Sequence, residues 1–252
     1  MKLLTLARDL KRRRARERQR LFVAEGVRAV EELVRSPLAV RGALVAPQLA
    51  DAPRGSALLA ALHARGVAVT EVGPLDFASA AETDSPQGIL AVAEIPDQPL
   101  ASLTLAERAR IVVLDAVQDP GNVGTILRTA AALGSDAVVA MPGTVDLWNA
   151  KVVRSAMGAL FHSPAIISTW SELDTFRATH ALAVWGADAS GTPLEVLTPP
   201  ARLALVVGNE GAGLSAEGQA RVEQSVSLPI RSTVESLNVA VATGILLYQL
   251  RV

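Results

Sequence analysis

The chain contains 252 residues, of which 50% are hydrophobic, 3% are aromatic and none is cysteine. This length provides enough apolar material for one large or two smaller domains. The lack of cysteine excludes disulfides, thiolate nucleophiles and cysteine-bound zinc. The three histidines (His63, His162 and His180) lack the spacing of a metal site, so we expect no metal ion.

A basic arm opens the chain. Residues 1–20 carry nine Lys and Arg residues but only Asp9 and Glu17 as acids, although the formal net charge of the whole chain is −1. Such a cluster is typical of binding to nucleic-acid phosphates. A solvated charged helix is the alternative, because Arg and Glu both favour helices. The candidate RNA-binding residues of the arm are Lys11, Arg12, Arg13, Arg14, Arg16, Arg18 and Arg20.

After the arm, short apolar strands alternate with helical stretches, which is the pattern of an α/β protein. The expected strands of the first half are 21–23, 40–45, 67–72 and 89–93, and the expected helices are 27–34 and 57–64. The proline-containing stretch 95–104 supports neither a helix nor a central strand. We therefore expect a first domain of residues 1–96, a linker of residues 97–104 and a second domain of residues 105–252.

The second domain is expected to contain a parallel sheet, because its apolar runs are short, continuous and separated by helices. The expected strands are 111–114, 137–140, 165–168, 181–185, 203–207 and 226–228, and helices are expected to begin near residues 125, 147, 172, 216 and 237. The longest apolar run, Val239–Leu250, is too short to span a bilayer. The basic N-terminus also lacks the apolar stretch of a secretory signal, so we expect a cytoplasmic protein.

Three loops of the second domain combine small residues with amide, hydroxyl or charged side chains: DPGNVGTILR (119–128), GNEGAGLS (208–215) and LPIRSTVESLN (228–238). Ligands of open α/β sheets bind beyond the carboxyl ends of strands, so these loops are expected to face one crevice. Ordinary turns between strands and helices are the alternative. Neither GxGxxG nor GxxxxGK[ST] occurs, and Glu210 places a negative charge where a polyphosphate would lie. The loops therefore favour a ligand without a phosphate chain.

The stretches NVGTILR, GNEGAGLS and ESLNVAVA, in this order, resemble the three motifs of the SpoU/TrmH (SPOUT) family of RNA ribose 2′-O-methyltransferases. KVVRSAMGALFHSP (151–164) is similar to a segment that the family carries between its first and second motifs. This resemblance covers residues 105–252. FVAEGVRAVEELV and SPQGILAVAE, within residues 1–96, are similar to the substrate-binding domain of the ribosomal RNA members.

The resemblance implies an α/β protein whose C-terminal domain is a trefoil knot with a parallel sheet, preceded by a smaller α/β RNA-binding domain. It implies S-adenosylmethionine as the cofactor, which carries a sulfonium, an amino acid and a ribose but no phosphate. It also implies a homodimer formed through the knotted domain. The helix beginning at Leu237 is apolar nearly all round, which fits burial either at such an interface or inside one subunit.

The resemblance further implies which residues bind the cofactor. The backbones of Gly208, Leu228 and Leu237 match positions that line the cofactor pocket. The remaining cofactor-binding residues are expected to be Asn209, Ile230 and Asn238. For the three apolar side chains, plain core packing is the alternative.

Catalytic roles also follow from the resemblance. Arg128 matches a family arginine proposed to assist removal of the proton from the ribose 2′-hydroxyl. Because a guanidinium almost never loses its own proton, we expect Arg128 to hold the adjacent phosphate and to stabilise the developing alkoxide. Asn122 is expected to orient Arg128 or the ribose, and Ser236 and Asn238 to position the hydroxyl or the cofactor. Glu210 is expected to brace its loop, hold the arginine or relay the proton.

One segment departs from the family. Relatives read I-P-M-x-G where this chain has Leu228-Pro229-Ile230-Arg231-Ser232. Because this chain has serine in place of that glycine, the resemblance does not define the backbone conformation of this segment or its contacts with the cofactor. Arg231 adds a positive charge where RNA phosphate would pass, and we include it among the candidate RNA-binding residues.

The two-domain layout resembles the ribosomal RNA members and favours a ribose of 23S ribosomal RNA as the substrate. A tRNA ribose 2′-O-methyltransferase and a non-catalytic RNA-binding or ribosome-assembly factor of the same fold are the alternatives. A general nucleotide-binding α/β protein would instead bind ATP or NAD. Phe22 and Phe77 are the only Phe, Tyr or Trp residues in the sequence of residues 1–96, which argues against base stacking as the main mode of RNA binding.

Overall fold

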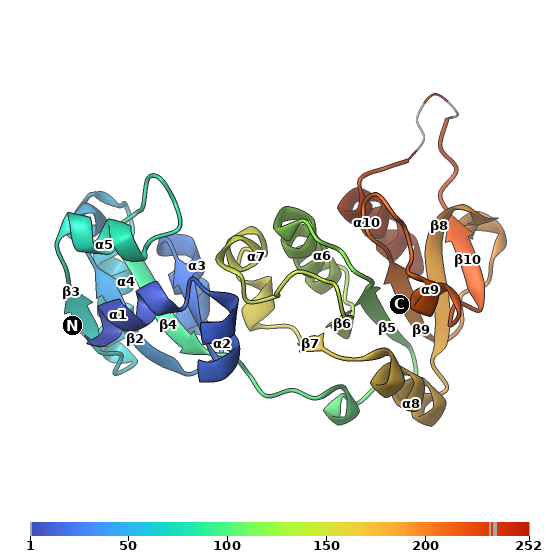
Figure 1. Cartoon of the computed structure of the whole chain (residues 1–252), viewed down its shortest axis with the longest axis horizontal. Coiled ribbons are helices and arrows are strands. Elements are labelled where there is room, and N and C mark those ends of the chain that lie inside the picture. The colour runs from blue at the N-terminus through green and yellow to red at the C-terminus, as the bar shows by residue number, and fades with distance from the viewer. Residues whose placement is uncertain (1, 232, 234–235, 252) are drawn as a thin grey trace. The chain divides into compact units, whose positions relative to one another are not determined.

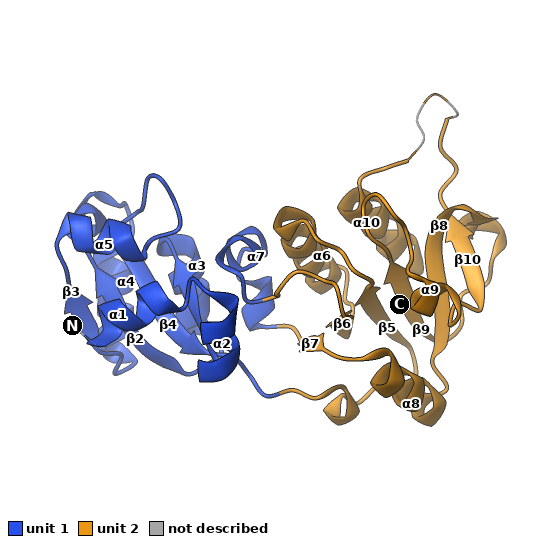
Figure 2. Ribbon diagram, in the orientation of Figure 1, with its two compact units in different colours: residues 1–97, 148–162 blue, residues 98–147, 163–252 orange. Residues whose placement is uncertain are grey.

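The computed structural model describes residues 2–231, 233 and 236–251. The chain divides into two compact units. The first comprises residues 1–97 and 148–162, and the second comprises residues 98–147 and 163–252 (Figure 2). Each unit combines one sheet with helices (Figure 1), so the predicted α/β class is confirmed.

The first unit is built on a mixed four-stranded sheet of order β1-β4-β2-β3. Strand β4 pairs antiparallel with β1 and β2, and β2 pairs parallel with β3. The central strand β4 is buried along almost its whole length, which is why this stretch is a continuous apolar run. The strands are β1 (Leu21–Glu25), β2 (Val40–Val45), β3 (Val69–Glu71) and β4 (Ile89–Glu94).

The basic arm is folded into the first unit rather than extended from it. Its apolar residues Leu4, Ala7 and Leu10 are buried in one cluster with Phe77 and Leu90. The first helix of the arm, KLLTLARD, carries apolar residues at helical spacing, whereas the second, RRARERQ, is rich in the good helix formers Arg, Glu and Gln. The helices of the unit are α1 (Lys2–Asp9), α2 (Arg13–Gln19), α3 (Val27–Arg35), α4 (Gly55–Ala64), α5 (Pro74–Ala80) and α7 (Ala150–Ser155), with short 3₁₀ helices η1 (Pro47–Asp51) and η3 (Ala159–Phe161).

Residues 148–162 belong to the first unit although they lie between the first and second motifs in sequence. The ring of Phe22 on β1 lies 4.6 Å from that of Trp148 and 5.6 Å from that of Phe161, measured between centroids. His162 also lies 3.6 Å from Glu32 of α3. Aromatic contacts between residues distant in sequence therefore hold this segment, which local patterning does not reveal.

The second unit contains a six-stranded, fully parallel sheet of order β10-β8-β9-β5-β6-β7. The central strand β5 is buried at every residue, as expected for a parallel strand covered on both faces. Strand β8 continues beyond the predicted end at residue 185. The strands are β5 (Ala109–Leu114), β6 (Ala137–Ala140), β7 (Ala165–Ile167), β8 (Ala183–Pro193), β9 (Arg202–Val207) and β10 (Gln224–Ser227).

Helices α6 and α10 of the second unit pack against each other. They approach so closely that a Cβ added at Gly244 of α10 would lie 3.3 Å from Thr129 of α6. The helices are α6 (Pro120–Ala132), α8 (Trp170–His180), α9 (Ala216–Gln219) and α10 (Val239–Leu250), with 3₁₀ helices η2 (Leu100–Ser102) and η4 (Leu194–Val196). Within the described residues, none of the helices is long and apolar enough to cross a membrane.

Candidate active site

The first two motif loops leave adjacent strands of the second unit at the same level. Leu114, the last residue of β5, is the register partner of Val207, the last residue of β9. The next residue, Asp115, donates its backbone N–H to the Val207 carbonyl at 2.9 Å, and its Oδ2 accepts the Ser215 N–H at 2.7 Å. Asp115 is only 1% exposed. A buried carboxylate therefore ties the end of the second loop to the start of the first.

The second loop is a tight turn closed on itself. Asn209 and Gly213 exchange backbone hydrogen bonds of 2.9 and 3.0 Å. The Asn209 side chain accepts the N–H groups of Gly211 and Ala212, and it donates to the Ala116 carbonyl at 3.0 Å. A Cβ on Gly208 would lie 2.3 Å from the Gly213 carbonyl carbon, so only glycine fits there. The glycine pattern in the sequence thus reflects close approach of two backbone segments.

Glu210 points back at the first motif. Its carboxylate accepts the Asn122 side-chain amide and the Asp119 N–H at 3.0 Å each, and the Gln118 N–H at 3.3 Å. Desolvation raises the pKa of Glu210, but the hydrogen bonds from Asn122, from the Glu210 backbone and from the amides of Asp119 and Gln118 together lower it below its ordinary value of 4.5. Glu210 is therefore a carboxylate at neutral pH.

Asn122 joins the first motif to the third. While its amide N–H donates to Glu210, its oxygen accepts the Asn238 side-chain amide at 2.9 Å. Asn238 in turn caps helix α10, because its Oδ1 accepts the N–H groups of Ala240 and Val241. Asn122 itself lies in the first turn of α6, which Asp119 caps. One chain of hydrogen bonds thus joins residues from all three motifs.

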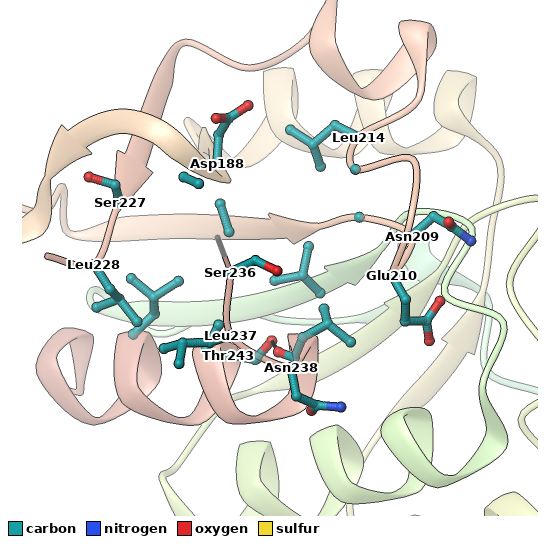
Figure 3. Close-up of a pocket in the computed structure, with 18 of the residues that line it drawn as sticks. Asp188, Asn209, Glu210, Leu214, Ser227, Leu228, Ser236, Leu237, Asn238 and Thr243 are labelled. Carbon is teal, nitrogen blue, oxygen red and sulfur yellow. Dashed lines mark hydrogen bonds between the residues drawn. The ribbon is translucent and has the colours of Figure 1, made fainter. Parts of the chain in front are cut away.

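A cavity of about 470 Å³ opens beside this chain of hydrogen bonds (Figure 3). Its walls combine small and apolar residues with a few polar side chains, which is typical of a cofactor site. The predicted residues that line it are Gly208, Asn209, Glu210, Leu228, Ile230, Ser236, Leu237 and Asn238. Sequence reasoning missed Asp188, Ser227 and Thr243, which also line it. Asp188 lies within β8, beyond the end that the sequence predicted for this strand, so no sequence signal marked it.

The predicted residues Asn122, Arg128 and Arg231 do not line the cavity, and one further position that departs from the family pattern lies outside the described residues. Arg128 is exposed on α6 and does not line the cavity, and it makes no hydrogen bond or ion pair to any described residue. Arg231 is exposed and does not line the cavity. Ser232, which replaces the family glycine, lies outside the described residues. The catalytic and cofactor-binding roles assigned from sequence stay predictions.

Most cations of the basic arm have partners within the first unit. Arg12 and Arg18 contact Asp9, Arg13 contacts Glu17, and Arg20 contacts Asp97. Lys11 donates to the Ala81 carbonyl at 2.7 Å.

The other two candidate RNA-binding residues of the arm, Arg14 and Arg16, differ most in their surroundings. Arg16 is 5% exposed and donates to the carbonyls of Leu10 and Lys11 at 2.7 and 2.8 Å. Arg14 is exposed and has no hydrogen bond or ion pair within the described part of the chain. The roles of the arm residues in RNA binding stay predictions.

No group of three or more His, Cys, Asp or Glu side chains among the described residues is arranged to hold a metal ion. The cavity, the glycine-rich turn of the second loop and the N-termini of the capped helices α6 and α10 instead lie at the carboxyl ends of parallel strands. This is where α/β enzymes bind organic cofactors. These features define a cofactor-binding α/β enzyme.

Residues 109–248 match the SpoU rRNA Methylase family, and residues 5–91 match the MRM3-like substrate binding domain. The chain belongs to the SpoU rRNA methylase family. The predicted family and RNA methyltransferase class are thereby confirmed, and membership implies the trefoil knot.

The similarity to individual members extends over almost the whole chain. The chain is 36% identical over 240 residues to the 23S rRNA (guanosine(2553)-2′-O)-methyltransferase RlmP of Bacillus subtilis, covering 95% of this chain and 92% of the relative. The crystal structure of the SpoU methyltransferase AviRb from Streptomyces viridochromogenes, in complex with the cofactor AdoMet, matches with a TM-score of 0.87 at 28% identity and covers 98% of this chain and 96% of that one. An AdoMet-bound rRNA methyltransferase from Sinorhizobium meliloti matches with a TM-score of 0.86 at 27% identity, over 98% and 93%. The predicted cofactor, S-adenosylmethionine, is thus bound in both structural relatives.

Proposed function

We propose that this protein transfers the methyl group of S-adenosylmethionine to the 2′-oxygen of a ribose in 23S ribosomal RNA. The observation that carries the proposal is the hydrogen-bonded chain Glu210–Asn122–Asn238, which joins the three motifs at the edge of the cavity. The relative from Bacillus subtilis, matched over nearly its full length, is named for this reaction on 23S rRNA.

The cavity suits the cofactor in shape and charge. S-adenosylmethionine supplies, when bound, a methyl group on a positively charged sulfur that leaves as a neutral thioether. Gly208 permits close backbone approach, and Leu228 and Leu237 provide half-buried apolar contacts. No basic side chain lines the cavity among the described residues, which fits a ligand without phosphate.

Arg128 is the group we assign to the substrate. A ribose hydroxyl becomes a nucleophile only as its proton leaves, so the site must stabilise the developing negative oxygen. The exposed guanidinium of Arg128, unpaired within the described residues, is available to contact that oxygen or the neighbouring phosphate. Glu210 is a weak proton acceptor because hydrogen bonds keep its pKa low. We therefore assign it the role of bracing the first and second motifs.

The protein is further proposed to act as a homodimer that uses helix α10. Val241, Ile245 and Tyr248 of this helix are 52%, 40% and 57% exposed. Their spacing places them on one face, and with Thr125 and Thr129 of α6 they line a shallow apolar groove. A second copy of the chain would remove this apolar surface from water.

Light scattering after gel filtration tests the dimer. We expect a mass of twice the 26.3 kDa chain, and we expect Ile245→Glu to reduce it to one chain, because a charge would be buried at the interface. Leu75→Glu, at an 88% exposed leucine of the first unit, is the matched control and should stay dimeric. A monomeric wild type would contradict the dimer.

The substrate is tested by incubating the protein and labelled S-adenosylmethionine with unmodified 23S rRNA and, separately, with unmodified tRNA. We expect label on 23S rRNA. Label on tRNA alone would move the substrate and keep the reaction, whereas label on neither, with intact RNA binding, would favour a non-catalytic assembly factor. A 23S rRNA substrate also implies the compartment in which ribosomes are assembled, the cytoplasm in bacteria.

A further inference from the structure

The cavity of the second unit carries charge of one sign. Asp188 and Glu210 are the charged side chains among its described lining residues, and both are acidic. A wall with acidic and no basic groups attracts cationic ligands and repels anionic ones. The charge of the cavity therefore affects how tightly it binds a cationic cofactor relative to an uncharged product.

The two acids are not equivalent. The Glu210 carboxylate accepts hydrogen bonds from Asn122, Asp119 and Gln118. Asp188 accepts only from Ser190, whose N–H and Oγ lie 2.7 and 2.6 Å from its Oδ1. Its Oδ2 has no hydrogen bond or ion pair to any residue that the structure describes, and the side chain is exposed. Asp188 thus has an oxygen free for a ligand.

Asp188 stays ionised across the neutral range. The hydrogen bonds from the Ser190 side chain and backbone lower its pKa below the ordinary value of 3.8, against a smaller effect of desolvation. The carboxylate at the wall of the cavity therefore carries a full negative charge at neutral pH.

The reaction changes the charge of the ligand in the cavity. S-adenosylmethionine carries a sulfonium, an ammonium and a carboxylate, hence one net positive charge. The demethylated product, S-adenosylhomocysteine, has a neutral sulfur and no net charge. The two molecules share their other polar groups, so a group that acts through hydrogen bonds to the shared parts affects both equally. A carboxylate acting through charge favours only the sulfonium form.

We propose that Asp188 determines cofactor specificity by favouring the sulfonium form over the demethylated product, so that spent cofactor leaves the cavity more readily. This inference rests on the proposed function, because it takes the cavity as the cofactor pocket. Asp188 acts through charge, and Ser190 holds its carboxylate in place.

Calorimetric titration of the full chain with S-adenosylmethionine and S-adenosylhomocysteine tests the proposal. Its readout is the ratio of the two dissociation constants, product over cofactor. In Asp188→Asn, which keeps the shape and the acceptor for Ser190, we expect this ratio to fall about three- to tenfold, the size of one charge interaction that water largely screens. If Asp188→Asn does not fold, Asp188→Ala takes its place, and the same decrease in the ratio is expected.

Glu195→Gln is the matched control, because Glu195 is an exposed acid of the same unit that does not line the cavity. An unchanged ratio in this variant is expected. An equal weakening of both ligands in Asp188→Asn would overturn the proposal, since Asp188 would then hold a part that the two molecules share. An unchanged ratio in Asp188→Asn, or an equal fall in Glu195→Gln, would also overturn it. Failure of the wild type to bind either ligand would overturn the proposed function as well.

Discussion

In the first unit, Arg12 and Arg18 contact Asp9, and Arg13 contacts Glu17. In the second unit, by contrast, Arg128 is exposed on α6 and makes no ion pair or hydrogen bond to any described residue. The first unit holds the denser cluster of positive charge in sequence, yet most of those cations already have acceptors within the unit. Charge that is counted in a sequence is therefore not the same as charge that is available to a phosphate.

The comparison also separates two uses of arginine. Arg16 is buried and fixes the end of helix α1 through main-chain carbonyls, so its work is structural. Arg128 has no such partner within the described residues, and we propose that it contacts the substrate. The comparison would fail if a variant of Arg16 left folding stability unchanged, or if a variant of Arg128 left methyl transfer unchanged.

The largest effect is expected for Arg128→Ala. Removal of a group that stabilises a developing negative charge lowers the turnover rate about 10²–10³-fold, while the dissociation constant of S-adenosylmethionine should stay within about twofold of the wild type. Single-turnover methylation and calorimetry measure the two quantities. Arg128→Lys, which keeps the charge but not the planar fork, should retain part of the rate. A rate within about tenfold of wild type in Arg128→Ala would contradict the assigned role.

The next effect is on folding and concerns Arg16. Arg16→Ala leaves the carbonyls of Leu10 and Lys11 without their buried donor, so we expect the free energy of unfolding to fall by about 2 kcal/mol. Urea unfolding followed by circular dichroism measures it. Arg14→Ala, two residues away on the same helix, is the control and should change it by less than about 0.5 kcal/mol. Equal effects of the two variants would show that Arg16 has no special structural role.

A smaller effect is expected for Glu210→Gln. The amide cannot accept all three hydrogen bonds of the carboxylate, so we expect cofactor affinity to fall about tenfold. Because the pKa of Glu210 is lowered in the folded protein, its carboxylate contributes to the free energy of unfolding. This contribution is fully present above pH 4.5 and is lost as the pH falls through the lower folded-state pKa. Urea unfolding of the wild type at pH values from 8 to 4 should therefore show the free energy of unfolding falling only at the acidic end. If Glu210→Gln shows the same fall, another group is responsible.

The smallest effect concerns Arg14, a candidate RNA-binding residue without a hydrogen bond or ion pair to any described residue. Arg14→Ala should weaken RNA binding uniformly and reduce the slope of log affinity against log salt by about 0.7–0.9, the value for one released counterion. Filter binding at several salt concentrations measures the slope. Arg13→Ala, whose wild-type side chain pairs with Glu17, should change it less. A larger change for Arg13→Ala would remove the distinction between paired and unpaired cations.

Much of the second unit could be predicted from the sequence. Buried parallel strands are continuous apolar runs, so residues 111–114 and 203–207 were placed correctly. Glycine, Asn and Glu at strand ends also identified the loops that border the cavity. The hydrogen bond between the side chains of Asn122 and Asn238 could not be predicted, because it depends on how helices α6 and α10 pack against each other.

The position of residues 148–162 in the first unit shows more clearly what local sequence patterns cannot predict. Trp148 and Phe161 pack on Phe22, more than 120 residues earlier in the chain. No local pattern marks such a contact, since apolar side chains pack equally well against any complementary surface. The pairing of Arg20 with Asp97 and of Lys11 with the Ala81 carbonyl escaped prediction for the same reason, because both acceptors are distant in sequence.

The central claim is methyl transfer to a ribose oxygen. It is tested most directly by transferring labelled methyl from S-adenosylmethionine to unmodified 23S rRNA and then hydrolysing the RNA in alkali. A methylated 2′-oxygen does not attack the neighbouring phosphate, so we expect the label in an alkali-resistant dinucleotide. Label found only in mononucleotides would place the methyl group on a base and contradict the claim, as would a lack of label on any RNA that the protein binds.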